Sequence, residues 1–202
     1  MIDERTRDCM ELKQGQNGCK IGCKTNKKKK GENKMHEIIE FQFAYAGWAT
    51  EKLFVVLEKI SKEEYNAPGC SGHGSIRDTL AHCLSAEQGW FLWFDKSMSV
   101  SDSMAVRLKS EEIETMIQAR EHWQAIRQRT ERCIRSLTEN EMLVLWSAAT
   151  PRGNIALPLW KFLLHVANHG THTRAQIVST LRRLGYDPGN YDLFRYALNP
   201  AI

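Results

Sequence analysis

The chain has 202 residues, of which 42% are hydrophobic and 26% are charged, and this is the composition of a globular domain. The length gives room for one ordinary domain with an extension and argues against a two-domain enzyme. The longest apolar runs, such as residues 90–94, are far shorter than the ~20 residues that a bilayer span requires. We therefore expect no transmembrane protein.

The net charge of +4 comes from residues 1–34, which hold 10 lysines and arginines against 5 acidic residues. From residue 35 onward the charges nearly balance, so no concentrated basic surface for nucleic acid is expected. Residues 1–34 lack apolar periodicity and contain the run Lys27–Lys30, which predicts a disordered basic extension. They contain no hydrophobic stretch of the secretory kind, so the protein is expected to be cytoplasmic.

Three amphipathic helices are predicted in the first part of the domain, which spans residues 35–202. The first covers residues 36–60, where apolar residues recur at three- and four-residue steps. The second starts at Ser75, because Asp78 three residues later completes a capping-box pattern, and it ends near residue 95. A polar connection over residues 96–109 leads to a third helix over residues 110–137 with a seven-residue repeat.

A hairpin and a fourth helix are predicted in the second part. The apolar stretches 143–146 and 155–157 flank the turn sequence Pro151-Arg152-Gly153-Asn154. The fourth helix begins near Pro158 and ends at Leu184, before Gly185. The expected fold is all-α: a four-helix bundle with a long crossover and a small β-hairpin before the last long helix.

Histidines on two of these helices indicate the chemistry. His165, His169 and His172 project from a strip about 60° wide at 100° per residue, and His169 leans furthest toward the apolar stripe. His82 stands between Leu80 and Leu84 on the second helix. Helical bundles form metal sites from such side chains on facing helices. The alternative for each is a core histidine hydrogen-bonded to backbone or water, and His36, His73 and His122 are given no functional role.

Two segments together carry a family resemblance. The string Leu164-His165-Val166-Ala167-Asn168-His169-Gly170-Thr171-His172-Thr173-Arg174-Ala175-Gln176-Ile177, paired with Ser75-Ile76-Arg77-Asp78-Thr79-Leu80-Ala81-His82, resembles the DinB family of DNA-damage-inducible bacterial proteins. The resemblance covers about residues 35–196 and includes Tyr45, Trp48 and the Gly153-Asn154 turn. It implies a four-helix bundle, commonly a homodimer, that binds a divalent metal such as zinc or nickel.

The family's metal ligands fall on His82, His169 and position 173, which is a threonine here. A neutral threonine hydroxyl is a poor zinc ligand. His172 is predicted as the third ligand and His165 is the alternative. Two further possibilities remain open: a weak site of two histidines with water, or loss of the metal.

The resemblance implies a thiol-dependent S-transferase or isomerase that uses bacillithiol, mycothiol or glutathione on a small-molecule substrate. Tyr45 and Trp48 can line the mouth of the site or serve as core aromatics, and Arg174 and Gln176 can hold a cofactor carboxylate or lie in solvent or at a dimer face. The alternative function is a non-catalytic, metal-poor dimeric bundle that acts as a binding scaffold in a stress response. Thr173 leaves open whether the chain is an enzyme.

Overall fold

The computed structural model describes residues 34–70, 72–150 and 153–199. The chain divides into two units, Met1–Lys30 and Gly31–Ile202, and all the described residues belong to the second unit. The disordered extension predicted over residues 1–34 therefore lies outside the described residues, apart from Lys34, which begins the first helix.

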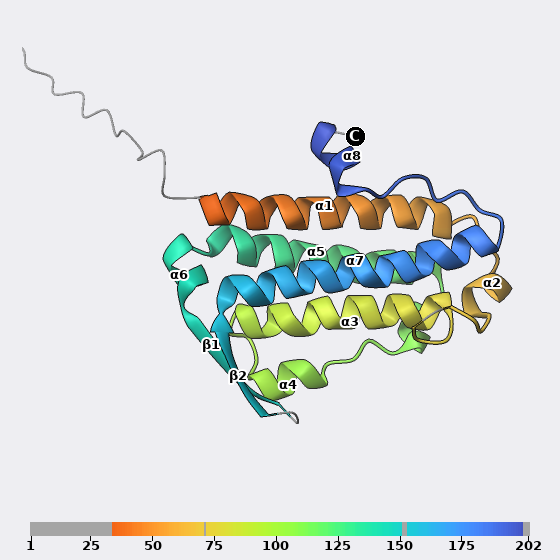
Figure 1. Cartoon of the computed structure of the whole chain (residues 1–202). Helices are drawn as coiled ribbons and strands as arrows, with labels where there is room; N and C mark the ends of the chain where they lie inside the picture. Colours follow the sequence, from red (N-terminus) through yellow and green to blue (C-terminus); the bar gives the residue numbers. More distant parts are fainter. Residues whose placement is uncertain (1–33, 71, 151–152, 200–202) are drawn as a thin grey trace, which may run out of the picture. The chain divides into compact units, whose positions relative to one another are not determined.

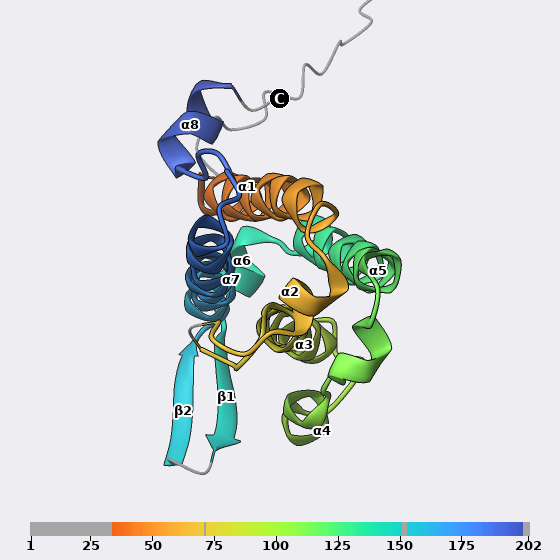
Figure 2. The same cartoon turned by 90° about the vertical axis from the view of Figure 1, so that its right-hand side faces the viewer.

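Four long helices form a bundle (Figure 1). They are α1 (Lys34–Leu57), α3 (Ile76–Phe94), α5 (Met116–Ser136) and α7 (Leu159–Arg183). Around the bundle the order is α1, α5, α3 and α7, as the view along the helices shows (Figure 2). The helices α1 and α7 run one way and α3 and α5 run the other, so the connection from α3 to α5 returns along the bundle. This is the predicted long crossover, and the all-α four-helix prediction is confirmed.

Short helices occupy the connections and the C-terminal segment. They are α2 (Lys62–Asn66), α4 (Val100–Ala105), a 3-10 helix (Ser110–Ile113), α6 (Glu139–Leu143) and α8 (Leu193–Leu198). The predicted polar connection over residues 96–109 thus contains α4, which sequence periodicity did not indicate. The backbone of α4 approaches α3 closely at Gly89, where an added Cβ would lie 2.7 Å from the carbonyl oxygen of Ser103. Within the described residues, no helix combines the length and the apolar content needed to cross a membrane.

The predicted hairpin is confirmed. Strands β1 (Leu145–Thr150) and β2 (Gly153–Pro158) pair antiparallel, with Trp146 opposite Leu157. Residues 151–152 of the predicted turn lie outside the described residues. The ring of Trp146 packs against Trp93 of α3 at a centroid distance of 5.1 Å, which ties the hairpin to the bundle just before α7 begins.

The described residues form three apolar clusters, of which one joins α1 to α8 and the other two lie along the bundle. Of these two, one lies at the α2 end and includes Leu53, Leu80 and Ile177, and the other lies at the hairpin end and includes Phe91 and Leu163. At intermediate positions along the four long helices stand four polar residues, which we call the polar layer: Thr50, Glu87, Thr130 and Arg174. Thr130 Oγ1 donates a 2.8 Å hydrogen bond to Glu87 Oε1 across the α5–α3 contact.

Candidate metal centre between α3 and α7

The start of α3 fixes the side of that helix on which His82 lies. Ser75 Oγ accepts a hydrogen bond from the Asp78 backbone N–H at 3.0 Å, and Asp78 Oδ2 accepts one from the Ser75 N–H at 3.3 Å. This reciprocal capping box confirms the predicted start of the helix. Leu80 and Leu84 are then buried in the core, and His82 lies beside them, half-buried.

On α7 the three neighbouring histidines differ in burial. His169 is half-buried, whereas His165 and His172 are exposed. The prediction that His169 leans furthest toward the core is therefore confirmed. Leu184, the predicted last residue of this helix, is 39% exposed and forms its C-terminal cap.

His82 and His169 meet across the α3–α7 contact. Their Nε2 atoms lie 3.0 Å apart, and their ring planes are inclined by 60°. At this separation one imidazole can donate a proton to the other, or both lone pairs can be directed at one cation. Two nitrogens that each lie about 2.0–2.1 Å from a tetrahedral zinc ion are themselves about 3.3 Å apart. The observed separation thus suits a hydrogen bond and is close to that of two ligands sharing one ion.

Burial keeps both rings uncharged. Desolvation lowers the pKa of His82 to about 4, and the nearby positive charges that His73 and His169 can carry lower it further. Desolvation also lowers the pKa of His169, with the neighbouring histidines acting in the same direction. Both imidazoles are therefore neutral near pH 7, which is the form that ligates a metal ion.

Thr173, at the family's third ligand position, faces its own helix. Its side chain is 1% exposed, and Oγ1 donates a 2.9 Å hydrogen bond to the carbonyl oxygen of His169. The hydroxyl is thus hydrogen-bonded to the backbone four residues earlier, as threonine hydroxyls commonly are within a helix.

The two proposed replacement ligands contact other groups in this structure. The Nε2 atom of His172 lies 3.2 Å from Gln176 Nε2. The ring of His165 packs edge-on against Trp90 at 5.6 Å and lies 6.3 Å from the ring of His169. Within the described residues, no group of three or more His, Cys, Asp or Glu side chains is arranged to hold a metal ion. The structure therefore brings two of the predicted site residues together.

Sequence reasoning missed His73. Its ring stacks on His82, with a centroid distance of 3.7 Å and an interplanar angle of 22°. The loop that carries it is closed by hydrogen bonds from the Gly69 and Cys70 N–H groups to the Gly74 carbonyl. Gly72 has a φ of +125°, and an added Cβ there would lie 2.6 Å from Gln176 Oε1, so the loop can lie close against α7. The only sequence signal was the pair of glycines around this histidine.

The aromatic residues predicted as possible walls of the site lie elsewhere. Tyr45 and Trp48 pack against Tyr196 of α8 at centroid distances of 5.9 and 5.4 Å. Tyr45 also donates a 2.6 Å hydrogen bond to the carbonyl oxygen of Tyr191. These rings join α1 to the C-terminal segment, which agrees with the core interpretation of both residues.

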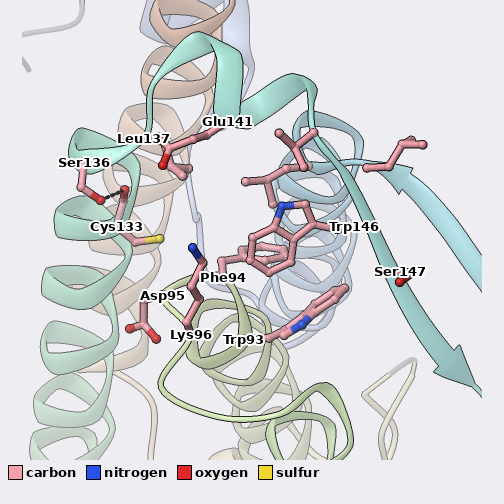
Figure 3. Close-up of a pocket in the computed structure, with 13 residues that line it drawn as sticks. Trp93, Phe94, Asp95, Lys96, Cys133, Ser136, Leu137, Glu141, Trp146 and Ser147 are labelled. Carbon is pink, nitrogen blue, oxygen red and sulfur yellow. Dashed lines mark hydrogen bonds between the residues drawn. The ribbon is translucent and has the colours of Figure 1, made fainter.

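A separate cavity of about 590 Å³ lies near the hairpin (Figure 3). The rings of Trp93, Phe94 and Trp146 line one side of it, and Lys96 and Cys133 lie across from them (Figure 3). Burial raises the pKa of the Cys133 thiol to about 11, so it stays protonated near neutral pH. The cavity contains no histidine among its lining residues, so the predicted imidazole chemistry belongs to the α3–α7 contact.

The protein is a four-helix bundle with a long crossover and a small hairpin, and it carries a pair of facing histidines on α3 and α7. These features define a class of helical proteins. The sequence profile of the DinB family matches residues 33–199, and the chain belongs to this family. It is similar to Protein DinB of Bacillus subtilis (strain 168), with 28% identity over 158 residues, 76% of this chain and 91% of that protein.

Proposed function

We propose that this protein binds a divalent metal ion, zinc or nickel, through His82 and His169. The observation that carries the proposal is the 3.0 Å separation of two Nε2 atoms that come from facing helices. Imidazole nitrogen is a favoured ligand of both metals. Because the pKa of each ring is lowered, neither has to lose a proton before it binds a cation near pH 7.

The third protein ligand is proposed to be His172, with His165 as the alternative, and the structure adds His73 as a further candidate. In its present position the His73 ring is nearly parallel to that of His82, and imidazole lone pairs lie in the ring plane. The ring must therefore turn out of the stack before it can share an ion with His82. His73 is exposed and lies between Gly72 and Gly74, so its loop leaves space for that rotation.

A cation with an open coordination position would lower the pKa of a thiol or water bound there. We propose that this thiol is a low-molecular-weight compound such as bacillithiol, mycothiol or glutathione. The proposed reaction is transfer of the thiol sulfur to a small molecule, or isomerisation of that small molecule. The chain's own contribution is to hold two neutral imidazoles in fixed positions. The capping box of α3 and the packing of Leu80 and Leu84 orient His82, and the Gly72–Gly74 loop covers one face of its ring.

One observation favours the alternative function. Thr173 stands at a ligand position and donates its hydroxyl to the His169 carbonyl. Without a third ligand there, His82 and His169 can serve as a simple hydrogen-bonded contact between α3 and α7. In that case the protein is a metal-poor member of the family, and we propose that it acts as a homodimeric binding scaffold in a stress response.

Metal content separates the two proposals. Elemental mass spectrometry of tag-free protein is expected to find near one equivalent of zinc or nickel in the wild type, with loss in His82→Ala and in His169→Ala. His122→Ala, on α5, is the matched control and should keep its metal. The variants His172→Ala, His165→Ala and His73→Ala then identify the third ligand. An empty wild type with a loaded Thr173→His variant would contradict the metal proposal and favour the scaffold.

A further inference from the structure

A permanently charged side chain is buried on the α1 side of α7. Arg174 is 5% exposed, and its guanidinium lies over Gly170, where an added Cβ would be 3.0 Å from Nη1. It donates long hydrogen bonds to the hydroxyls of Thr50 (3.4 Å) and Thr171 (3.3 Å). Both acceptors are neutral, and within the described residues no carboxylate lies within 4.0 Å of this guanidinium.

Glu87, the acidic member of the polar layer, lies near Arg174 but forms no ion pair with it within 4.0 Å. Its carboxyl group accepts a hydrogen bond from Thr130, and burial raises its pKa despite the attraction of Arg174 and Arg127. Desolvation thus disfavours the charged form of this carboxyl group. An arginine cannot respond to burial in that way, because its guanidinium stays protonated at all physiological pH values. A buried cation without a counter-ion is costly, so the site favours an anion from solution.

A second polar group lacks a partner at the same place. The hydroxyl of Tyr191 is buried and has no hydrogen-bond partner within the described part of the chain. Tyr191 and Arg174 both line a cavity of about 470 Å³ between α7, α1 and the segment that leads to α8. Arg182 stands at its exposed side, and Ala175 and Val178 give it apolar walls. The Asp192 carboxylate at the rim accepts a hydrogen bond from the Phe194 N–H and caps α8.

We propose that this cavity binds a small organic carboxylate. The planar guanidinium of Arg174 can donate two parallel hydrogen bonds to a carboxylate, and the unpartnered hydroxyl of Tyr191 is the candidate for a third donor. Arg182 adds positive charge at the entrance. The volume exceeds that of a single inorganic ion and falls within the range of small-molecule sites, so the apolar walls hold the organic body of the ligand.

This site is independent of the metal proposal. Because α7 lies between α1 and α3, its two sides face different neighbours (Figure 2). His169 meets α3, whereas Arg174 meets Thr50 of α1. The carboxylate site and the histidine pair therefore use different side chains of α7.

Calorimetric titration at constant ionic strength tests the proposal with four probes: benzoate, malonate, the neutral analogue benzamide and inorganic phosphate. Benzoate or malonate is expected to bind the wild type at least about tenfold more tightly than benzamide or phosphate. Tyr191→Phe should weaken carboxylate binding about five- to tenfold, and Arg174→Gln should abolish it. Arg195→Gln, on α8 and outside the cavity lining, is the control and should bind as the wild type does.

Two results would overturn the proposal. One is an absence of saturable carboxylate binding to the wild type, or a preference for phosphate over both carboxylates. The other is carboxylate binding that Tyr191→Phe leaves unchanged. The tyrosine variant decides the matter if Arg174→Gln does not fold, because it removes only a hydroxyl that has no hydrogen-bond partner among the described residues.

Discussion

The two sides of α7 bury polar groups that respond to burial in opposite ways. Toward α3, His82 and His169 lower their pKa values and become neutral, and their Nε2 atoms then contact each other at 3.0 Å. Toward α1, the Arg174 guanidinium donates long hydrogen bonds to two neutral hydroxyls and lies over the Tyr45 ring, and within the described residues it has no ion-pair partner. We therefore propose a cation site on the first side and an anion site on the second.

This contrast shows how a single helix can carry two kinds of site. A titratable base avoids the cost of desolvation by losing its proton, and the freed lone pair becomes a metal ligand. A guanidinium has no such route, so it needs either an acidic neighbour or a ligand. Burial likewise disfavours the charged form of Glu87, which lies in the same polar layer, and raises its pKa.

The largest expected effect comes from removing the apolar support of the histidine side. Leu80 is 1% exposed in the cluster at the α2 end of the bundle, two residues before His82. Leu80→Ala should lower the free energy of unfolding by about 2–5 kcal/mol, as cavity-forming core substitutions do. Val55→Ala, at a 48% exposed position of α1, should change it by less than about 0.5 kcal/mol. Urea denaturation measures both, and equal effects would contradict the packing described for α3.

The histidine side should also make stability depend on pH. The unfolded chain protonates His82 below pH 6.5, but the folded chain does so only near pH 4, so stability is lost as the pH falls between these values. The loss should be about 1–2 kcal/mol in EDTA-treated protein, reduced from the full linkage value because the ring keeps some solvent contact. His82→Gln should lose less stability over this range. Parallel stability curves for the two proteins would contradict the neutral, desolvated imidazole.

The smallest effect distinguishes two tyrosines on the arginine side. Tyr45→Phe removes a 2.6 Å hydrogen bond to the Tyr191 carbonyl and should cost about 0.5–1.5 kcal/mol. Tyr191→Phe removes a hydroxyl without a described partner and should change stability by less than about 0.5 kcal/mol in the absence of ligand. Thermal unfolding of both variants checks the order, and a larger cost for Tyr191→Phe would show that its hydroxyl is already satisfied.

Local sequence signals predicted the long helices and placed His82 and His169 as members of one candidate site. The Ser75–Asp78 capping box, the apolar periodicity of α3 and α7, and the spacing of His165, His169 and His172 all act within a few turns of one helix. They placed His82 and His169 on sides that face each other, and the structure joins these two residues.

The features that sequence reasoning missed depend on contacts between distant segments. His73 lies in a glycine-containing loop and stacks on His82. Apolar periodicity predicts helices and strands but not the path of such a loop. The burial of Arg174 depends on the absence of a side chain at Gly170 and on Thr50 from another helix. A single sequence gives the residue types at these positions but not their neighbours in space, so neither the stacked ring nor the buried cation could be predicted.

The most direct test of the metal proposal is anomalous diffraction at the zinc edge from crystals grown with zinc. The account predicts one strong peak in contact with the Nε2 atoms of both His82 and His169, and loss of that peak in His82→Ala crystals. The same map would show which of His172, His165 and His73 completes the site. Crystals that carry zinc only at other positions, with the two Nε2 atoms still 3.0 Å apart in a hydrogen bond, would contradict it.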